Sequence, residues 1–272
     1  MTLQIANVSD VGRRRPHNED STATDAEQGL FILADGMGGY KAGEVASAVA
    51  VLTVLEDIKA AMKNGVTTHK LADGTNGAIP ELIKQAINHA NTTIYNLAQA
   101  EAECQGMGTT IVTGIIHDKT ITVGNVGDSR LYRLRMGKLQ QITKDHSLIQ
   151  ELIDRGMYTP EEAMAKMPRN LVTRALGLAT RVEVDIIQQP VNTGDIYLLC
   201  SDGLNDMVND EEIHLTLSKY SANLVQAAEN LVQLANSKGG KDNISVVLVR
   251  ITNDTETRKK GVSLRKYIKR FF

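Results

Sequence analysis

The sequence predicts an α+β fold in which antiparallel β-sheets carry α-helices on their outer faces. Three observations predict it. Two long segments with Ala, Leu and Ile at helical spacing lie in the first half of the chain. A run of short strand-like segments follows them, and two further helical segments precede a last strand. Runs of strands and runs of helices, without strict alternation, are typical of antiparallel sheets with helices stacked outside.

The expected elements follow in order along the chain. Residues 3–8 alternate apolar and polar side chains, and residues 31–34 form a short apolar run, as strands do. Residues 42–62 and 80–104 have helical periodicity, with a Thr- and Gly-rich loop at 63–79 between them. Further strands are expected at residues 109–116, 120–126, 130–135, 138–143, 182–188, 195–201 and 245–251. Further helices are expected at residues 146–154, 210–217 and 221–238, with a mobile flap at about 150–170 that contains a short helix at 160–166.

Composition is that of a water-soluble globular protein. The chain has 272 residues, of which 42% are hydrophobic and 23% charged, enough for one large domain or two small ones. The start of the chain lacks the pattern of a signal peptide, and no apolar run approaches the ~18 residues of a membrane span. Cys104 and Cys200 lie in apolar surroundings, which predicts buried free thiols in a reducing compartment. We therefore expect a cytoplasmic protein.

Charge is distributed unevenly along the chain. Residues 257–272 carry seven basic and no acidic residues, whereas the remainder carries 23 basic and 32 acidic ones. An acidic body argues against nucleic-acid binding and suits a site that concentrates divalent cations. The basic tail has apolar residues on one helical face, so it could contact an anionic membrane or a partner protein, or be a frayed terminus.

The most informative stretch is FILADGMGG at residues 31–39. An apolar strand runs into Asp35, and the glycines that follow let the backbone bend and expose its carbonyl groups. A carboxylate beside an exposed carbonyl is a site for a hard cation. Taken alone, the pattern equally fits a turn in which Asp35 caps the next helix.

The same pattern recurs, and the recurrence favours the cation site. Further acidic residues stand at strand ends or tight turns, namely Asp20, Asp128, Asp202 and Asp242. Acidic residues so placed over more than two hundred positions suggest convergence in space. For Asp128, the alternative that it only caps a turn stays open. Arg15 precedes Asp20 on a stiff loop, and a guanidinium near such a site would grip phosphate oxygens bidentately.

Taken together, these motifs resemble the protein phosphatase 2C family of metal-dependent serine/threonine phosphatases, in its bacterial form. The resemblance covers about residues 5–251, and all motifs appear in the family order. They are Arg15 with Asn18-Glu19-Asp20, Asp35-Gly36-Met37-Gly38-Gly39, Gly108-Thr109-Thr110, Gly127-Asp128-Ser129-Arg130, Ser201-Asp202-Gly203-Leu204 and Asp242-Asn243. The resemblance implies an α-β-β-α sandwich, two antiparallel sheets flanked by helix pairs. It also implies a catalytic domain over residues 1–254, and the residues left over, 255–272, form the basic amphipathic tail described above.

The resemblance also implies a set of roles for the motif residues. Asp20, Asp35, Asp202 and Asp242 would form a two-metal centre for Mn²⁺ or Mg²⁺, with Asp35 bridging the ions. The carbonyl group of Gly36 would be a further ligand. Asp128, with Asp202, would hold a third ion.

Other residues would act around that centre. Arg15 would bind the substrate phosphate, and Glu19 and Asn243 would orient waters or carboxylates. Family members often have a His just after the glycine turn, which is proposed to protonate the leaving group. Tyr40 stands there in this sequence, and it or a metal-bound water is the candidate proton donor.

The implied reaction is hydrolysis of phosphoserine and phosphothreonine in proteins, in opposition to a Ser/Thr kinase. A hydroxide bridging two cations would attack phosphorus directly, without a phosphoenzyme. Two alternatives stay open. The departure at Tyr40 is compatible with a pseudophosphatase that binds phosphoproteins without turnover, and the basic tail is compatible with a membrane-recruited scaffold.

Overall fold

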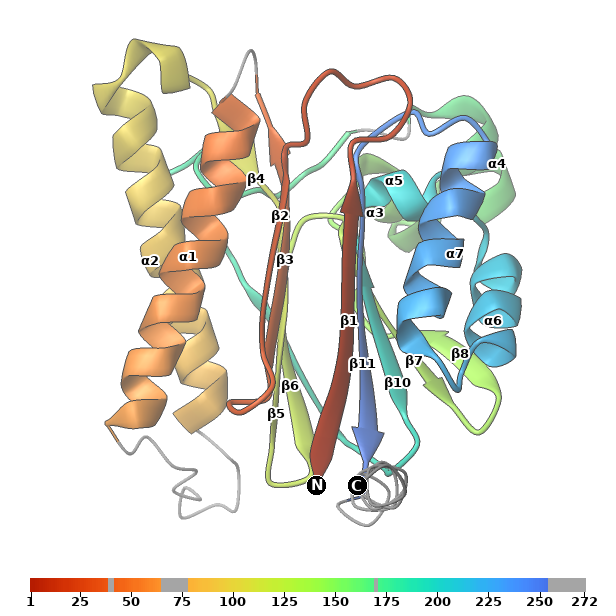
Figure 1. The fold of residues 1–272 in the computed structure, drawn as a ribbon. Coiled ribbons are helices and arrows are strands. Elements are labelled where there is room, and N and C mark those ends of the chain that lie inside the picture. Colours follow the sequence, from red (N-terminus) through yellow and green to blue (C-terminus); the bar gives the residue numbers. More distant parts are fainter. Residues whose placement is uncertain (39–41, 65–77, 169–170, 254–272) are drawn as a thin grey trace, which may run out of the picture.

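The chain forms a four-layer sandwich. The computed structural model describes residues 1–38, 42–64, 78–168 and 171–253. Two β-sheets pack face to face; α1 (Ala42–Lys63) and α2 (Ala78–Ala100) cover one outer face, and α6 (Asp210–Lys219) and α7 (Leu224–Ser237) cover the other (Figure 1). This arrangement confirms the predicted sandwich of two antiparallel sheets flanked by helix pairs.

Both sheets are antiparallel throughout their described pairings. The first sheet has the order β2 (Asp20–Asp25), β3 (Leu30–Met37), β5 (Ile111–His117), β6 (Thr120–Val126) and β9 (Asp185–Pro190), with β4 (Gly108–Thr109) paired to β3. The second has the order β1 (Thr2–Asp10), β11 (Ile244–Thr252), β10 (Ile196–Cys200), β7 (Arg130–Arg135) and β8 (Lys138–Gln141).

Alternation along the strands divides the core into layers. In β3, Leu30, Ile32 and Ala34 pack with α1 and α2, whereas Phe31 and Leu33 point to the second sheet. Both faces of β3 are therefore buried, which explains its continuous apolar run. A third apolar layer lies between the second sheet and α6 and α7.

Several helices and strands begin or end at other residues than predicted. For the strands, the reason is that hydrogen bonding to a neighbouring strand sets where each one begins and ends. Strand β2 was not predicted, since its sequence DSTATD is polar; pairing with β3 makes it a strand. Strand β9 lies about three residues later than expected, in register with β6. The helix expected at 80–104 ends at Ala100, with a short 3-10 turn at Ala102–Cys104. The strand expected at 109–116 is divided into β4 and β5.

Other expectations concern the cysteines, the flap and the tail. Both cysteines are free, but only Cys200 is buried; Cys104 is half-buried, which corrects the expectation for it. The flap contains α3 (Leu148–Asp154) and α4 (Pro160–Lys166). Tyr40 and residues 254–272, which include the predicted tail, lie outside the described residues. Within the described ranges, no helix combines the length and apolar character that would let it cross a membrane.

Candidate metal centre

The candidate site lies where strands of both sheets end. In the first sheet, Asp20 opens β2 and is the direct cross-strand partner of Asp35 in β3. Side chains of directly paired residues lie on the same face, about 5 Å apart. The hairpin that sequence reasoning missed therefore brings two of the predicted acidic residues together.

The second sheet delivers Asp202 to the same place. Strand β10 ends at Cys200, and Asp202 is the first residue of the short helix α5 (Asp202–Asn205). Ser201, between them, donates a hydrogen bond from Oγ to Oδ2 of Asp20 at 2.8 Å. The Ser201 Oγ in turn accepts a hydrogen bond from the backbone N–H of Ser245 at 2.9 Å. Ser201 thus ties the two sheets together. The motif contains this serine, but sequence reasoning gave it no role.

Asn243 holds the loop that carries Glu19 and Asp20. Its Oδ1 accepts a hydrogen bond from the backbone N–H of Glu19 at 2.8 Å. Its Nδ2 donates to the carbonyl oxygens of Val11 and His17, both at 2.9 Å. Asn243 itself is buried, and the three bonds join it to the partly exposed loop in front of β2. The side chain therefore orients backbone next to Asp242, the residue before it.

Gly36 allows three backbone segments to meet beside Asp35. A Cβ atom at Gly36 would lie 2.1 Å from the carbonyl oxygen of Gly43 and 2.6 Å from that of Glu19. The Gly36 N–H donates to the Glu19 carbonyl at 3.1 Å. On the other side of Asp35, the Thr110 hydroxyl accepts from the Asp35 N–H at 3.1 Å. Thr110 and the Gly36 turn thus fix the backbone of Asp35.

Electrostatics show that the five predicted aspartates converge. The pKa of Asp35 is raised well above its ordinary value, first by burial and then by the charges of Asp20, Asp202, Asp128 and Asp242. Each of these carboxylates is therefore within electrostatic reach of Asp35. We call these five residues the acidic cluster. The five aspartates therefore lie near one another, as the sequence indicated. The role of each residue stays a prediction.

Burial raises the pKa of other members of the acidic cluster. The pKa of Asp20 rises to about 6, although hydrogen bonds from Ser245 and Ser201 oppose the effect of burial. The pKa of Asp202 also rises well above its usual range, through burial and then the charge of Asp128. Oδ1 of Asp20 is buried without a hydrogen-bond partner among the described residues. A buried carboxylate oxygen without a donor is expected where a cation binds.

Asp128 follows β6 on a loop that His146 fixes. Gly127 has φ +108°, and its N–H donates to Nδ1 of His146 at 3.0 Å. His146 is buried, and its Nε2 lies 3.2 Å from Oδ2 of Asp185 in β9. Burial, followed by the charge of Asp145, raises the pKa of Asp128 to about 6.

Arg15 lies at the edge of the acidic cluster. Its Nη2 donates to Oδ2 of Asp242 at 2.7 Å, and 48% of the Arg15 side chain is exposed. The hydrogen bond to Asp242 and the charges of Asp242, Glu19 and Asp202 raise the pKa of Arg15, although burial opposes them. The positively charged guanidinium of Arg15 therefore lies next to the acidic cluster and faces solvent, as expected of a side chain that binds an anion.

Without bound cations, the charge on Asp20 should make stability depend on pH. The unfolded pKa of Asp is about 3.9, and the folded pKa of Asp20 is about 6. The stabilising contribution of protonated Asp20 is thus fully present below pH ~4 and is lost as the pH rises through about 6, an effect of about 3 kcal/mol. We expect the free energy of unfolding of the wild type, relative to Asp20→Asn, to fall over this range in EDTA. A difference in the free energy of unfolding that stays constant or rises with pH would contradict this prediction.

The comparisons with known proteins agree with this geometry. The family "Protein phosphatase 2C" matches residues 13–239. The chain is 41% identical over 244 residues to the serine/threonine phosphatase stp of Listeria monocytogenes, which covers 89% of this chain and 93% of that protein. The crystal structure of the Mycobacterium tuberculosis serine/threonine phosphatase PstP/Ppp has a TM-score of 0.82 at 36% identity, covering 93% of this chain and 100% of that one.

A further solved structure contains metal ions. It is the catalytic domain of the serine/threonine protein phosphatase PstP in complex with two manganese ions. It has a TM-score of 0.79 at 36% identity and covers 93% of this chain and 99% of that one. The matched region includes the loops of Arg15, Asp20, Asp35, Asp128 and Asp202. The chain therefore belongs to the protein phosphatase 2C family and is a serine/threonine protein phosphatase of that type.

Proposed function

We propose that the acidic cluster holds two divalent cations, Mn²⁺ or Mg²⁺, and that phosphoserine and phosphothreonine are hydrolysed there. The observation that carries the proposal is the convergence of five aspartates around Asp35, with Oδ1 of Asp20 buried and lacking a donor in the described part of the chain. Hard carboxylate oxygens suit these ions. When bound, such cations neutralise phosphate charge and make hydroxide available near neutral pH.

In this proposal, the side chains that would hold the two ions are those of Asp20, Asp35, Asp202 and Asp242. Across the described ranges, no three His, Cys, Asp or Glu side chains are placed to hold one ion by themselves. The carbonyl of Gly36 and water would complete the ligands, since Mg²⁺ usually keeps several waters. Asp128 and Asp202 would take a third ion.

The chain's own residues would bind and orient the substrate. Arg15 would pair with phosphate oxygens, because its guanidinium is half-exposed beside the cluster. Asn243 would keep the Glu19–Asp20 loop in place through its three hydrogen bonds. Glu19 would orient water near the ions.

Water, and not a side chain, would be the nucleophile, so no phosphoenzyme would form. Burial raises the pKa of the Cys200 thiol to about 12, so it is not an activated nucleophile. Tyr40 lies outside the described residues, so its role as the proton donor stays a prediction.

The partners of the enzyme would be phosphorylated proteins and a Ser/Thr kinase that it opposes. The free thiols suit a reducing, cytoplasmic location. The division into a catalytic domain at 1–254 and a tail at 255–272 stays a prediction, as does contact of the tail with an anionic membrane or a partner. Strand β11 ends at the opposite end of the sandwich from the acidic cluster (Figure 1).

The test is hydrolysis of p-nitrophenyl phosphate and of a phosphothreonine peptide, with EDTA, Mg²⁺ or Mn²⁺ in turn. We expect phosphate release that requires a divalent cation and stops in EDTA. Binding of Mn²⁺ and of the phosphopeptide without any release would favour the pseudophosphatase instead. Removal of residues 255–272 tests the scaffold alternative. That alternative predicts that the shortened protein loses its cellular function but still hydrolyses phosphate esters in solution.

A further inference from the structure

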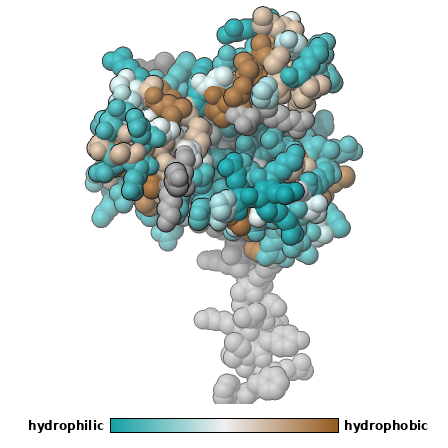
Figure 2. Space-filling model, turned by 90° about the horizontal axis from the view of Figure 1, so that it is seen from above, coloured by the Kyte–Doolittle hydropathy of each residue, from teal (hydrophilic) through white to brown (hydrophobic). Residues whose placement is uncertain are grey.

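His146 is a buried polar side chain close to the acidic cluster. Hydrophilic side chains cover much of the surface at this end of the molecule (Figure 2), so exposed polar groups are ordinary there. His146, in contrast, is only 6% exposed, although its ring carries two nitrogen atoms that need hydrogen-bond partners. The partners of those two nitrogen atoms therefore indicate what the side chain does.

The two ring nitrogens of His146 have different roles. Nδ1 accepts a hydrogen bond from the Gly127 N–H at 3.0 Å. A neutral imidazole carries one proton, so the proton of this ring lies on Nε2. Nε2 lies 3.2 Å from Oδ2 of Asp185 and 3.4 Å from Nη1 of Arg174. A protonated Nε2 cannot accept from Arg174, so the Asp185 carboxylate is its partner. Nη1 of Arg174 binds Oδ1 of the same carboxylate at 3.0 Å, which holds Asp185 in place beside the ring.

The bond to Nδ1 is one half of a two-point attachment of Gly127. The backbone N–H of His146 donates to the Gly127 carbonyl at 3.0 Å, so both polar groups of Gly127 are bound to the same residue. Gly127 has φ +108°, and an added Cβ would lie 2.6 Å from Cβ of Thr110. This position therefore admits glycine alone unless Thr110 moves. His146 thus sets the backbone conformation immediately before Asp128.

The residue after Asp128 is fixed as well. The hydroxyl groups of Ser129 and Thr110 share a hydrogen bond of 2.8 Å. The Thr110 hydroxyl also accepts from the N–H of Asp35 at 3.1 Å, which relates this segment to the centre of the acidic cluster. Asp128 is therefore held from both sides, by His146 through the residue before it and by Thr110 through the residue after it.

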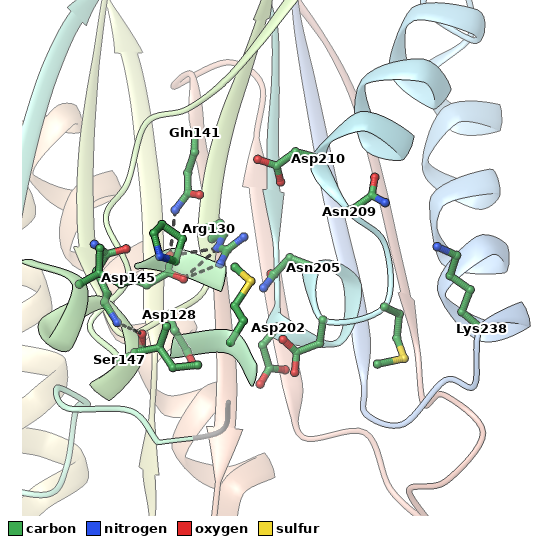
Figure 3. A pocket seen from close by; sticks show the side chains of 17 residues that line it. Asp128, Arg130, Gln141, Asp145, Ser147, Asp202, Asn205, Asn209, Asp210 and Lys238 are labelled. Carbon is green, nitrogen blue, oxygen red and sulfur yellow. Dashed lines mark hydrogen bonds and ion pairs between the residues drawn. The ribbon is translucent and has the colours of Figure 1, made fainter. Parts of the chain in front are cut away.

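His146 does not face the space in which a substrate would lie. Its chain neighbours Asp145 and Ser147 line a cavity of about 670 Å³ beside the acidic cluster, whereas His146 does not line it. Figure 3 shows Asp128, Asp145 and Ser147 on one side of this cavity and Asp202 on the other. Both ring nitrogens of His146 are occupied by other partners. Any effect of His146 on the reaction therefore acts through the backbone before Asp128.

We propose that His146 is a positioning residue, which holds the Asp128 carboxylate in place for a divalent cation through the hydrogen bond from Gly127 to Nδ1. The proposal rests on the proposed function, in which Asp128 and Asp202 take the third ion. It adds a role for a side chain that is not a member of the acidic cluster. Loss of a hydrogen bond that orients a metal ligand typically weakens metal binding by about 10- to 100-fold.

Two amide variants separate the roles of the two ring nitrogens. In His146→Asn, the amide oxygen can take the place of Nδ1 and accept from Gly127, while nothing replaces Nε2. In His146→Gln, the longer amide can take the place of Nε2, while the acceptor at Nδ1 is lost. We expect His146→Gln to weaken Mn²⁺ binding at the Asp128 site about tenfold. His146→Asn should retain most of that affinity.

Isothermal titration calorimetry with Mn²⁺ measures each binding step, and Asp128→Asn identifies the step that belongs to Asp128. Combining His146→Gln with Asp128→Asn should not weaken the remaining steps further, because His146 acts through Asp128. In hydrolysis of p-nitrophenyl phosphate, the Mn²⁺ concentration at half-maximal rate should rise about tenfold in His146→Gln. The value of kcat at saturating Mn²⁺ should fall less than this. A merely structural role would instead weaken all binding steps alike, together with a lower melting temperature.

Several outcomes would overturn the proposal. Equal effects of His146→Asn and His146→Gln on the Asp128 step would do so and leave the two-ion centre intact. Loss of no binding step in Asp128→Asn would do the same. If the wild type binds no divalent cation, the proposed function itself fails.

A measurement on the wild type decides the matter if His146→Gln does not fold. In a Mg²⁺ titration followed by nitrogen-15 NMR, the ring nitrogens of His146 should shift with the binding step that Asp128→Asn removes. Ring resonances that stay unchanged through that step would refute the positioning role.

Discussion

Asp35→Asn is expected to lower kcat/KM for phosphate release by about 10³-fold or more, because metal ions contribute several kcal/mol to such reactions and each 1.36 kcal/mol is tenfold. Asparagine keeps the shape of the side chain but removes the charge at the centre of the acidic cluster. Hydrolysis of p-nitrophenyl phosphate at saturating Mn²⁺ measures the loss. Isothermal titration with Mn²⁺ should show weaker binding in parallel.

The same substitution should not destabilise the metal-free protein. Burial and the neighbouring carboxylates already disfavour the charged form of Asp35, which is why its pKa is raised. Loss of that charge relieves repulsion, so the melting temperature in EDTA should stay equal or rise. Asp25→Asn is the matched control, because Asp25 lies at the far end of the same hairpin and pairs with Lys59. More than a tenth of wild-type activity in Asp35→Asn would refute the assignment.

Gly36→Ala should cost about 4 kcal/mol or more of folding free energy, a value typical of severe steric conflict in a core. Its added Cβ would lie 2.1 Å from the carbonyl oxygen of Gly43 and 2.6 Å from that of Glu19. Both neighbours are backbone, so no side chain can turn away to make room. Either the β2–β3 hairpin or the start of α1 must move. Urea unfolding measures the loss from the transition midpoint and slope.

Gly106→Ala provides the contrast for this prediction. Gly106 has φ +77° but nothing within 4 Å of an added Cβ. Only the left-handed backbone conformation then opposes alanine, at about 1–2 kcal/mol. Similar costs for the two variants would show that close backbone approach at Gly36 is not what the site requires.

Local pattern was enough to predict the long helices and the acidic strand ends. Helices α1 and α2 need only their own apolar periodicity, and the apolar run of β3 needs only burial on both faces. Asp35, Asp128, Asp202 and Asp242 stand out because each follows an apolar run or a glycine turn, whereas Asp20 follows a polar loop. The family motifs, in their order, extended this reading to the sandwich and to phosphatase activity, and the comparisons confirm both.

Only the tertiary structure decided which polar segments pair and which side chains meet. Strand β2 exists because β3 supplies its hydrogen bonds, and the register that pairs Asp20 with Asp35 has no counterpart in the local sequence. The bond from Ser201 to Asp20 joins residues 181 positions apart. The hydrogen bond from Tyr132 of β7 to Asp210 of α6 likewise joins residues 78 positions apart. Propensity and periodicity act over a few residues, whereas these contacts follow from how two sheets pack, and packing sets the geometry of the site.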